Sequence, residues 1–337
     1  MIKKYTPGII LSILVAIISA KFSKFIPGGF ISPGVFALLF GMMINPLIQE
    51  HELYGHGVKF VSKRILKLGI ILMGATLSFG QVLEVGKYSL FVMSFTLLAA
   101  FGGGYYLGKL FGMNWKLSGL ISAGTGICGA SAIAAIAPTI QAEDRDIAYS
   151  ISATFIFDIV MVILFPIAGR YFGMSDLGFG LWAGTAVNDT SSVVATGYAF
   201  SDIAGSFAII VKLTRTLSIV PAVLIFSYIN ERLNTKHSSM NGENREKVNI
   251  KNIFPWFILM FLAVVGMKSI GVISQTLGED ISSISKFFMV MSLGAIGLNT
   301  NFKEVSKSGF LPMVHGFLIS ALVVVVSFGV QVLMGQI

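Results

Sequence analysis

Residues 309–334 read GFLPMVHGFLISALVVVVSFGVQVLM, without a single charged side chain, and residues 322–326 form an unbroken apolar run. A helix needs about 20 apolar residues to cross a hydrocarbon core of about 30 Å. A strand of a membrane β-barrel would instead alternate apolar and polar residues over about ten positions. Because the stretch does not alternate, it predicts a membrane-spanning helix.

Comparable apolar stretches recur along the whole chain, whose 337 residues are 55% hydrophobic and only 12% charged. Soluble domains carry roughly 25% charged residues. The composition therefore predicts an all-α polytopic membrane protein with about eleven transmembrane helices. The predicted spans are residues 8–20, 31–48, 65–82, 88–111, 117–140, 147–169, 177–200, 203–229, 253–272, 281–302 and 309–334.

We expect one membrane domain over residues 1–337, because no hydrophilic segment is long enough for a soluble domain. The expected parts are an extra N-terminal helix (1–30), a first five-helix repeat (31–172) and a second, inverted repeat (173–337) with a cytoplasmic loop (230–252). Two inverted repeats with broken helices are a recurrent transporter plan.

The pairing of helices between the two repeats has two possible registers. The first pairs span five with span ten, where Ser122/Gly124 and Ser292/Gly294 recur. The rival pairs span three with span ten through Gly74/Gly297, Phe79/Phe302 and Gly86/Gly309.

Basic residues are distributed unevenly between the two sides of the predicted membrane. With the N-terminus in the cytoplasm, the inner segments hold sixteen Lys and Arg residues and the outer segments hold six. The positive-inside rule therefore predicts a cytoplasmic N-terminus and an external C-terminus. The short first span is followed by Ile18-Ser19-Ala20, which resembles a signal-peptidase site, and its removal would leave the later orientation unchanged.

Several function classes find no support in the sequence. The net charge of +8 comes from basic loops on one side of the membrane and does not indicate nucleic acid. The single cysteine, Cys128, excludes a disulfide framework. An intramembrane enzyme would need a nucleophile–base pair or metal ligands. Cys128 has no histidine nearby, His51 and His56 fall in a predicted loop, and His315 is alone in its span, so we expect no enzyme, metal or cofactor.

Span five contains a cluster of glycines and hydroxyls at residues 123–131, AGTGICGAS. Each glycine costs a helix roughly 1 kcal/mol, so a continuous helix is disfavoured. Ser131 precedes a helical run that ends at Pro138. We expect a helix, a break and a second half-helix whose N–H groups attract anions. The alternative is close packing of small residues between helices.

Span seven contains a second polar segment at residues 184–192, GTAVNDTSS. An Asp-Thr-Ser run before an apolar run is typical of a helix N-cap. A carboxylate such as Asp189 costs about 2.5–3.5 kcal/mol or more in a membrane unless it is paired or hydrated. We expect a second broken helix here. The alternative, a short extramembrane turn, would leave two runs too short to span.

Two cations lie inside span eight. Lys212 and Arg215 are three residues apart and share a helix face, and Asp158 and Asp189 are their candidate counter-charges. Such a group would be either a structural charge network or a substrate and coupling site. A weaker candidate follows Gly294 in span ten and includes Asn299 and Thr300.

Three strings resemble one family of bacterial inner-membrane proteins. GTGICGASAIAA at residues 124–135, GLWAGT at 180–185 and VKLTR at 211–215 resemble the proteins proposed to export sulfate (the PSE family). The family is similar to the bile acid, arsenite and riboflavin transporter superfamily. The resemblance, from about Pro33 onward, implies a ten-helix inverted-repeat core, one extra N-terminal helix and an export function. The family usually has a histidine where this chain has Asn188, so a titratable group is missing there.

The broken helices and buried cations predict a secondary transporter that moves a small anion by alternating access. The resemblance implies that it is an exporter, with sulfate or a sulfonate as the anion. Because no G-x-x-x-x-G-K-[ST] string occurs, an ion gradient or the substrate's own gradient would drive it, with H⁺ or Na⁺ as the coupling ion. The alternative is a non-transporting scaffold or sensor. The expected partners are the anion, the lipid bilayer and, as an open option, a second copy in a homodimer.

The candidate residues fall into two groups by expected role. Asp158 and Asp189 are expected to compensate charge or bind the coupling ion. The expected substrate-binding residues are Gly124, Thr125, Gly126, Cys128, Gly129, Ser131, Asn188, Thr190, Ser191, Lys212, Arg215, Asn299 and Thr300.

Overall fold

The computed structural model describes residues 4–25, 33–48, 52–235, 256–300 and 309–336. All regular secondary structure within these residues is helical. The elements are α1 (Thr6–Phe25), α2 (Pro33–Ile48), α3 (Glu52–Phe60), η2 (Val61–Ile65), α4 (Leu66–Met73), η3 (Gly74–Thr76), α5 (Phe79–Leu110), α6 (Trp115–Ala123), η4 (Gly124–Cys128), α7 (Ala130–Ile136), α8 (Asp144–Tyr171), α9 (Asp176–Ala186), α10 (Thr190–Phe200), α11 (Asp202–Thr216), α12 (Ile219–Thr235), α14 (Trp256–Ser269), α15 (Gln275–Leu298) and α17 (Phe310–Leu333).

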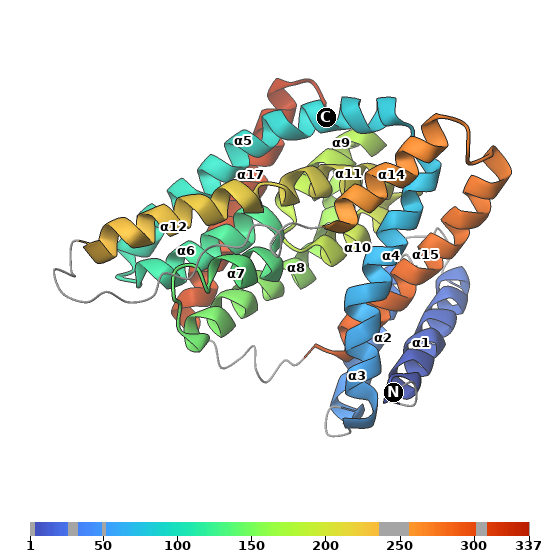
Figure 1. The fold of residues 1–337 in the computed structure, drawn as a ribbon, viewed down its shortest axis with the longest axis horizontal. Coiled ribbons are helices and arrows are strands. Elements are labelled where there is room, and N and C mark those ends of the chain that lie inside the picture. The colour runs from blue at the N-terminus through green and yellow to red at the C-terminus, as the bar shows by residue number, and fades with distance from the viewer. Residues whose placement is uncertain (1–3, 26–32, 49–51, 236–255, 301–308, 337) are drawn as a thin grey trace.

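The described helices form two bundles that lie side by side (Figure 1). The first bundle contains α1, α2, α3, η2, α4, η3, α14 and α15, with α15 packed along α2 and α4. The second bundle contains α5 to α12, η4 and α17, with α11 packed on α9 and α10, and α17 on α5 and α8. The main contacts between the bundles join α10 to α2 and α15, and α14 to α5.

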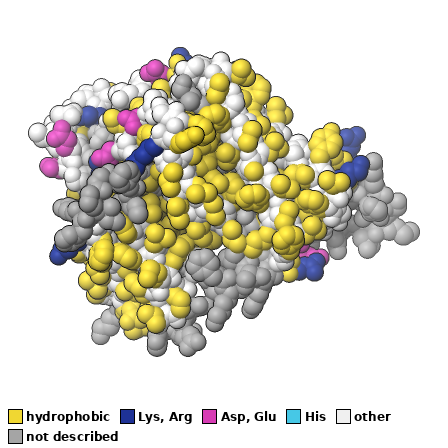
Figure 2. Space-filling view, turned by 180° about the vertical axis from the view of Figure 1, so that it is seen from behind, with side chains coloured by type: hydrophobic (Ala, Val, Ile, Leu, Met, Phe, Trp, Pro, Cys, Tyr) yellow, Lys and Arg dark blue, Asp and Glu magenta, His cyan; other side chains and the backbone are white. Residues whose placement is uncertain are grey.

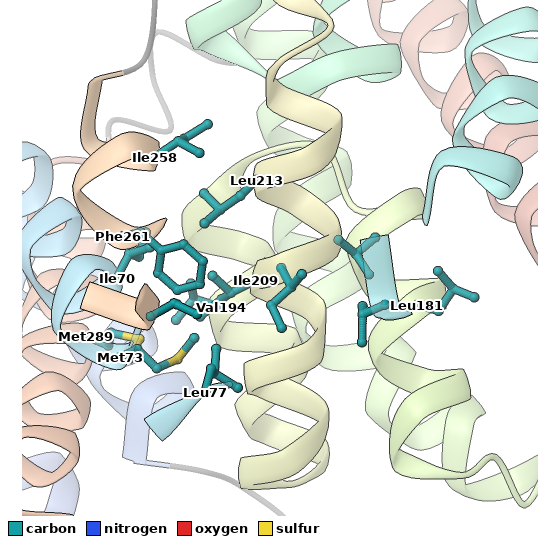
Figure 3. Packing of buried hydrophobic residues seen from close by; sticks show 14 of the residues in the cluster. Ile70, Met73, Leu77, Leu181, Val194, Ile209, Leu213, Ile258, Phe261 and Met289 are labelled. Atoms are coloured by element: carbon teal, nitrogen blue, oxygen red, sulfur yellow. The ribbon is translucent and has the colours of Figure 1, made fainter. Parts of the chain in front are cut away.

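Apolar side chains fill the interface between the two bundles. Figure 3 shows Ile258 and Phe261 of α14 close to Ile209 and Leu213 of α11, and Met289 of α15 belongs to the same buried cluster. Apolar contacts are non-directional and need no fixed partner. The contacts between the bundles here are therefore mostly apolar, with a hydrogen bond across the cluster from the Tyr198 hydroxyl of α10 to Met73 Sδ of α4, at 2.7 Å.

The outer surface is suited to lipid. Six segments within the described residues are long and apolar enough to cross a membrane, and α2 and α14 are shorter apolar helices. Large apolar side chains such as Leu98, Leu110 and Phe310 point outward. Figure 2 shows apolar side chains across the described face, with charged side chains toward its margins. The predicted all-α polytopic membrane fold is confirmed.

The third and fourth predicted spans have the wrong bounds. A helix already begins at Glu52, and it contains His56, which the sequence analysis placed in a loop. The next long helix, α5, begins at Phe79 and not at residue 88. Ser78 caps it, because the Ser78 side chain accepts from Gln81 N–H and the Gln81 side chain accepts from Ser78 N–H at 2.9 Å. This capping box is the sequence signal for the boundary.

The predicted halves, 31–172 and 173–337, do not coincide with the two bundles, because each bundle takes helices from both halves. The two spans of the first register, five and ten, differ in their helix structure. Span five is broken, whereas α15 in span ten runs unbroken through Gly294 and Gly297. The rival pairing keeps its partners together, with α4 and α15 in the first bundle and α5 and α17 in the second.

The predicted loop at 230–252 and the predicted N-terminal helix can each be compared with part of the described structure. The predicted loop at 230–252 begins within α12, which continues to Thr235, and its remainder lies outside the described residues. A helix is present near the N-terminus, as predicted: α1 packs against α2, α3 and α15 of the first bundle.

Glycines bring helix backbones of the first bundle into direct contact. A Cβ atom built on Gly41 of α2 would lie 2.3 Å from the carbonyl oxygen of Gly294 and 2.9 Å from the Cα of Gly297, both in α15. A Cβ atom on Gly8 of α1 would likewise lie 2.7 Å from the Cα of Gly57 in α3. These distances leave no room for any side chain, which is how small residues let membrane helices approach closely.

We expect Gly41→Ala to destabilise the protein, because α2 must move away from α15 to admit the methyl group. Overpacking of this kind costs roughly 1–3 kcal/mol. The matched control is Gly86→Ala in α5, where nothing lies within 4 Å of the added Cβ atom. Thermal unfolding in detergent should show a lower Tm for Gly41→Ala and an unchanged or higher Tm for Gly86→Ala. Equal Tm values would show that the α2–α15 contact is not tight.

Candidate functional site

The first predicted break is present in the middle of span five. After α6 the chain forms η4, a wide π-helical turn, and then reaches Gly129 at φ +61° and ψ −135°. A side chain is strained at this positive φ, so glycine is the residue that fits. The next helix, α7, begins at Ala130, one residue before the predicted Ser131.

The second predicted break separates α9 from α10. The three residues between them are Val187, Asn188 and Asp189, and both Val187 and Asp189 have extended backbones. The Asp189 carboxylate accepts hydrogen bonds from the backbone N–H of Ser191, at 2.8 Å, and from the Ser191 hydroxyl. Asp189 is therefore the N-cap of α10, which confirms that part of the prediction.

The two breaks touch each other. A Cβ atom built on Gly129 would lie 3.2 Å from the Cβ and 3.3 Å from the Cα of Asp189. We call the two broken segments, residues 124–131 and 187–191, the crossing. Four half-helices, α6 with η4, α7, α9 and α10, therefore end or begin at one place within the second bundle.

Lys212 and Arg215 of α11 point into the crossing, and both are fully buried. The Lys212 ammonium donates to the carbonyl oxygens of Ile127, at 2.7 Å, and Val187, at 3.1 Å. The Arg215 guanidinium donates to the carbonyl oxygens of Gly126, at 2.6 Å, Val187, at 3.2 Å, and Thr125.

The acceptors of both cations are the last carbonyls of two half-helices. Those of Thr125, Gly126 and Ile127 belong to η4, and that of Val187 follows α9. A helix C-terminus carries a partial negative charge and unpaired carbonyl groups. The two cations therefore satisfy the carbonyl groups that the breaks leave without helical partners.

The carboxylates at the crossing lie at the N-terminal end of a half-helix, whereas the cations lie at C-terminal ends. Asp158 of α8 is buried, and its two oxygens accept from the backbone N–H groups of Asn188, at 2.8 Å, and Asp189, at 2.9 Å. These N–H groups lead into α10, where the helix dipole is positive. Within the described residues neither Lys212 nor Arg215 lies within 4.0 Å of a carboxylate oxygen, so both signs of charge bond to backbone and not to each other.

Part of the crossing is open to its surroundings. Ser131 is exposed, and Asp189 and Thr190 are half-buried, whereas Asn188 and Cys128 are buried. Ser131, Asp189 and Thr190 are therefore the accessible part of the crossing, whereas Lys212, Arg215 and Asp158 are buried beneath them.

The crossing unites most of the predicted site residues, namely Gly124, Thr125, Gly126, Cys128, Gly129, Ser131, Asn188, Thr190, Ser191, Lys212, Arg215, Asp158 and Asp189. Asn299 and Thr300 belong to another region. Their hydrogen bonds are made with the last turn of α15, as in the 2.8 Å bond from the Thr300 hydroxyl to the carbonyl oxygen of Ile296. No group of three or more His, Cys, Asp or Glu side chains that could hold a metal ion occurs in the described part of the chain.

A pocket of about 120 Å³ lies between the bundles, lined by residues of α2, α10 and α15, among them Gly34, Val194 and Leu293. At its edge the Lys286 ammonium of α15 lies 2.6 Å from a carboxylate oxygen of Asp202, the first residue of α11. This ion pair joins the two bundles, and the sequence analysis did not identify it.

The chain is similar to other membrane proteins along nearly its whole length. A profile of the family described as "Conserved hypothetical protein 698" matches residues 7–335. A UPF0324 membrane protein of Clostridium tetani is 67% identical, covering 100% of this chain and 99% of that protein. UPF0324 membrane proteins of Streptococcus agalactiae and Fusobacterium nucleatum are 38% and 37% identical, covering 99% and 97% of this chain and 99% and 98% of their own lengths.

We expect Arg215→Met to destabilise the protein strongly, because it leaves buried carbonyl groups without a donor. Leaving a buried acceptor without its donor costs about 1–3 kcal/mol for each group. The control is Lys286→Met, whose ion pair is 42% and 68% exposed at its two side chains and is worth about 0–1 kcal/mol. Thermal unfolding in detergent compares the two variants. Full rescue of Arg215→Met by Asp158→Asn would show that charge balance, and not carbonyl capping, is the main role of Arg215.

Proposed function

The chain belongs to the membrane-protein family described as conserved hypothetical protein 698, and we propose that it is a secondary transporter of a small anion such as sulfate or a sulfonate. The observation that carries this proposal is the crossing, where two interrupted helices meet and buried charges gather. Irregular backbone within a membrane bundle is tolerated where protein surrounds it or a watery cavity reaches it. A scaffold has no need of such an arrangement.

Lys212 and Arg215 have N–H donors that are not used on backbone carbonyls and could bind an anion. Lys212 uses two of its three N–H donors on backbone carbonyls, and Arg215 uses three of its five. An anion that enters at Ser131 and Thr190 would meet hydroxyl groups first and the remaining donors of Lys212 and Arg215 behind them. Sulfate and sulfonate oxygens are suited to such donors, because charge-assisted hydrogen bonds are among the strongest in proteins.

Charge balance at the crossing supports coupling to a cation. Lys212 and Arg215 are balanced by Asp158 and Asp189, so the empty site is formally neutral. Bound anion would leave a net negative charge in a poorly solvated place, which is costly. One proton or Na⁺ bound at Asp158 or Asp189 restores neutrality for a sulfonate, and two such cations do so for sulfate, so we propose that anion and cation share the site in turn or together.

The two-bundle architecture supports alternating access. The interface between the bundles is apolar, and the pocket with its Asp202–Lys286 ion pair lies along it. Movement of the second bundle against the first would expose the crossing first on one side and then on the other. In this proposal the protein lies in the bacterial inner membrane with its N-terminus in the cytoplasm and works as an exporter. A homodimer is the oligomeric state that we propose to test.

The proposed function is tested by counterflow of ³⁵S-labelled sulfate in proteoliposomes, with unlabelled sulfate or methanesulfonate inside. We expect the wild-type protein to accumulate label and Lys212→Gln to lose at least about 2 kcal/mol of anion binding, about 30-fold. Glutamine can still donate to the Ile127 or Val187 carbonyl, so this variant should fold.

The control is Lys268→Gln in α14 of the first bundle. The Lys268 ammonium donates to the carbonyl oxygens of Ile273 and Ser274, in the segment between α14 and α15. This variant should transport like the wild-type protein. Folded wild-type protein that neither binds nor moves any anion of a broad panel would reject the transporter and favour a scaffold or sensor.

Linking the two bundles should stop transport. We expect Asp202→Cys with Lys286→Cys, in a Cys128→Ala background, to lose counterflow when a bis-methanethiosulfonate joins the thiols and to regain it after reduction with dithiothreitol. The ion pair places these positions within reach of the reagent. Each single-cysteine variant treated with the same reagent is the control. Unchanged counterflow in the cross-linked protein would show that the bundles do not move apart here.

A further inference from the structure

Buried polar side chains recur along α17, where Ser320, Ser327 and Gln331 share one face and His315 lies about 140° around the helix from Ser320. His315, Ser320, Ser327 and Gln331 are all fully buried within the second bundle. Residues 320 and 331 are eleven positions apart, so the shared polar face extends about 16 Å along the helix axis. Polar side chains of this kind are costly inside a membrane protein and commonly mark ion pathways.

Partners on three other helices face this row of side chains. His315 Nε2 lies 3.2 Å from the Ser118 hydroxyl of α6 and 3.1 Å from the carbonyl oxygen of Gly104 in α5. Toward the other end of α17, the Ser327 hydroxyl lies 2.6 Å from the Thr185 hydroxyl of α9.

The remaining two side chains of the row extend these contacts. The Gln331 amide donates to Ser327 at 3.2 Å. The Asn188 amide at the crossing donates to Ser320 at 3.3 Å. We call Ser118, Thr185, Asn188 and the four α17 residues the polar file.

The polar file contains acceptor atoms that no protein group reaches. His315 Nδ1, Asn188 Oδ1 and Gln331 Oε1 are buried without a hydrogen-bond partner, and so is Thr125 Oγ1 in η4. Nearly all buried polar atoms in proteins have a partner, and ordered water supplies it where protein does not. These four atoms are spread from the His315 end, past the crossing, to the Gln331 end.

The polar file meets Asp158 at Asn188. The backbone N–H of Asn188 donates to Asp158 at 2.8 Å, while its side chain belongs to the file. The charged groups around Asp158 are Asp189, the N-cap of α10, and Lys212 and Arg215 on α11. The Asp158 carboxylate therefore lies next to the polar file, whose hydrogen bonds form three separate groups, at His315, at Ser320 and at Ser327.

We propose that ordered water completes the polar file and that the file conducts protons between the ends of α17 and Asp158. This inference deepens the proposed function, since it assigns H⁺ as the coupling ion. A proton passed along the file converts the Asp158 carboxylate to a carboxylic acid. The oxygen that gains the proton becomes a donor, which weakens its hold on the N–H group of Asn188 or Asp189 and loosens the start of α10.

Silver ions test whether water reaches the file. In a Cys128→Ala background, Ser320→Cys and Ser327→Cys each place one thiol in the file, and Ag⁺ replaces the thiol proton to form a sulfur–silver bond. The matched control is Val323→Cys, a fully buried position on the same helix with an apolar environment. We expect the file thiols in proteoliposomes to react at least about tenfold faster than the control thiol. Equal rates would overturn the proposal.

Infrared spectroscopy tests whether the file conducts protons. A pH jump on a film of the reconstituted protein should produce a carboxylic-acid C=O band that is absent from Asp158→Asn. Thr185→Val with Ser327→Ala removes the file's hydroxyl groups at one end, and Ser118→Ala with Ser320→Ala removes them at the other. We expect the variant with all four changes to show the band at least about tenfold more slowly.

The control for the infrared experiment is Val325→Ala on the outward face of α17, which is 67% exposed. It should show the Asp158 band at the wild-type rate. An unchanged rate in the four-fold variant, confirmed as folded by its thermal unfolding, would overturn the proposal. Neither experiment uses the anion, so failure of sulfate counterflow and failure of the proton path can be told apart.

Discussion

Backbone carbonyls that lose their helical partners within a membrane must find a donor, because no bulk water is present to supply one. At the crossing four such carbonyls, from Thr125 to Ile127 and at Val187, accept from Lys212 and Arg215. Breaks in both helices and two buried cations in α11 are thus parts of one arrangement. Without the cations the interruptions would be unstable, and without the interruptions the cations would have no acceptors.

The same arrangement sorts charge by sign. Positive side chains lie at the C-terminal ends of half-helices, while Asp158 and Asp189 lie where α10 begins, so each charge faces the helix end that stabilises it. Helix α11 separates two environments, since Lys212 faces the crossing and Leu213, its neighbour, faces the apolar interface with the first bundle. The charged groups of the crossing are therefore separated from the interface between the bundles only by α11.

Local chemistry made both breaks predictable: a glycine cluster disfavours a helix, and an Asp-Thr-Ser run starts one. The acceptors of Lys212 and Arg215 were not predictable, because they are backbone groups from two other helices that only the tertiary structure brings together. The contact of Gly294 with Gly41 was not predictable either, since a glycine that admits a neighbouring backbone looks the same in sequence as one that ends a helix. The polar file was missed because its members are spread over four elements.

The contacts of Gly8 with Gly57 and of Gly41 with Gly297 have a mechanical consequence. Where main chains touch directly, there are no side-chain rotamers to rearrange, so neighbouring helices have little freedom to slide or tilt. Helices α1, α2, α3 and α15 therefore form a stiff frame, and strain imposed by the surrounding lipid would be taken up at the softer apolar boundary beyond it.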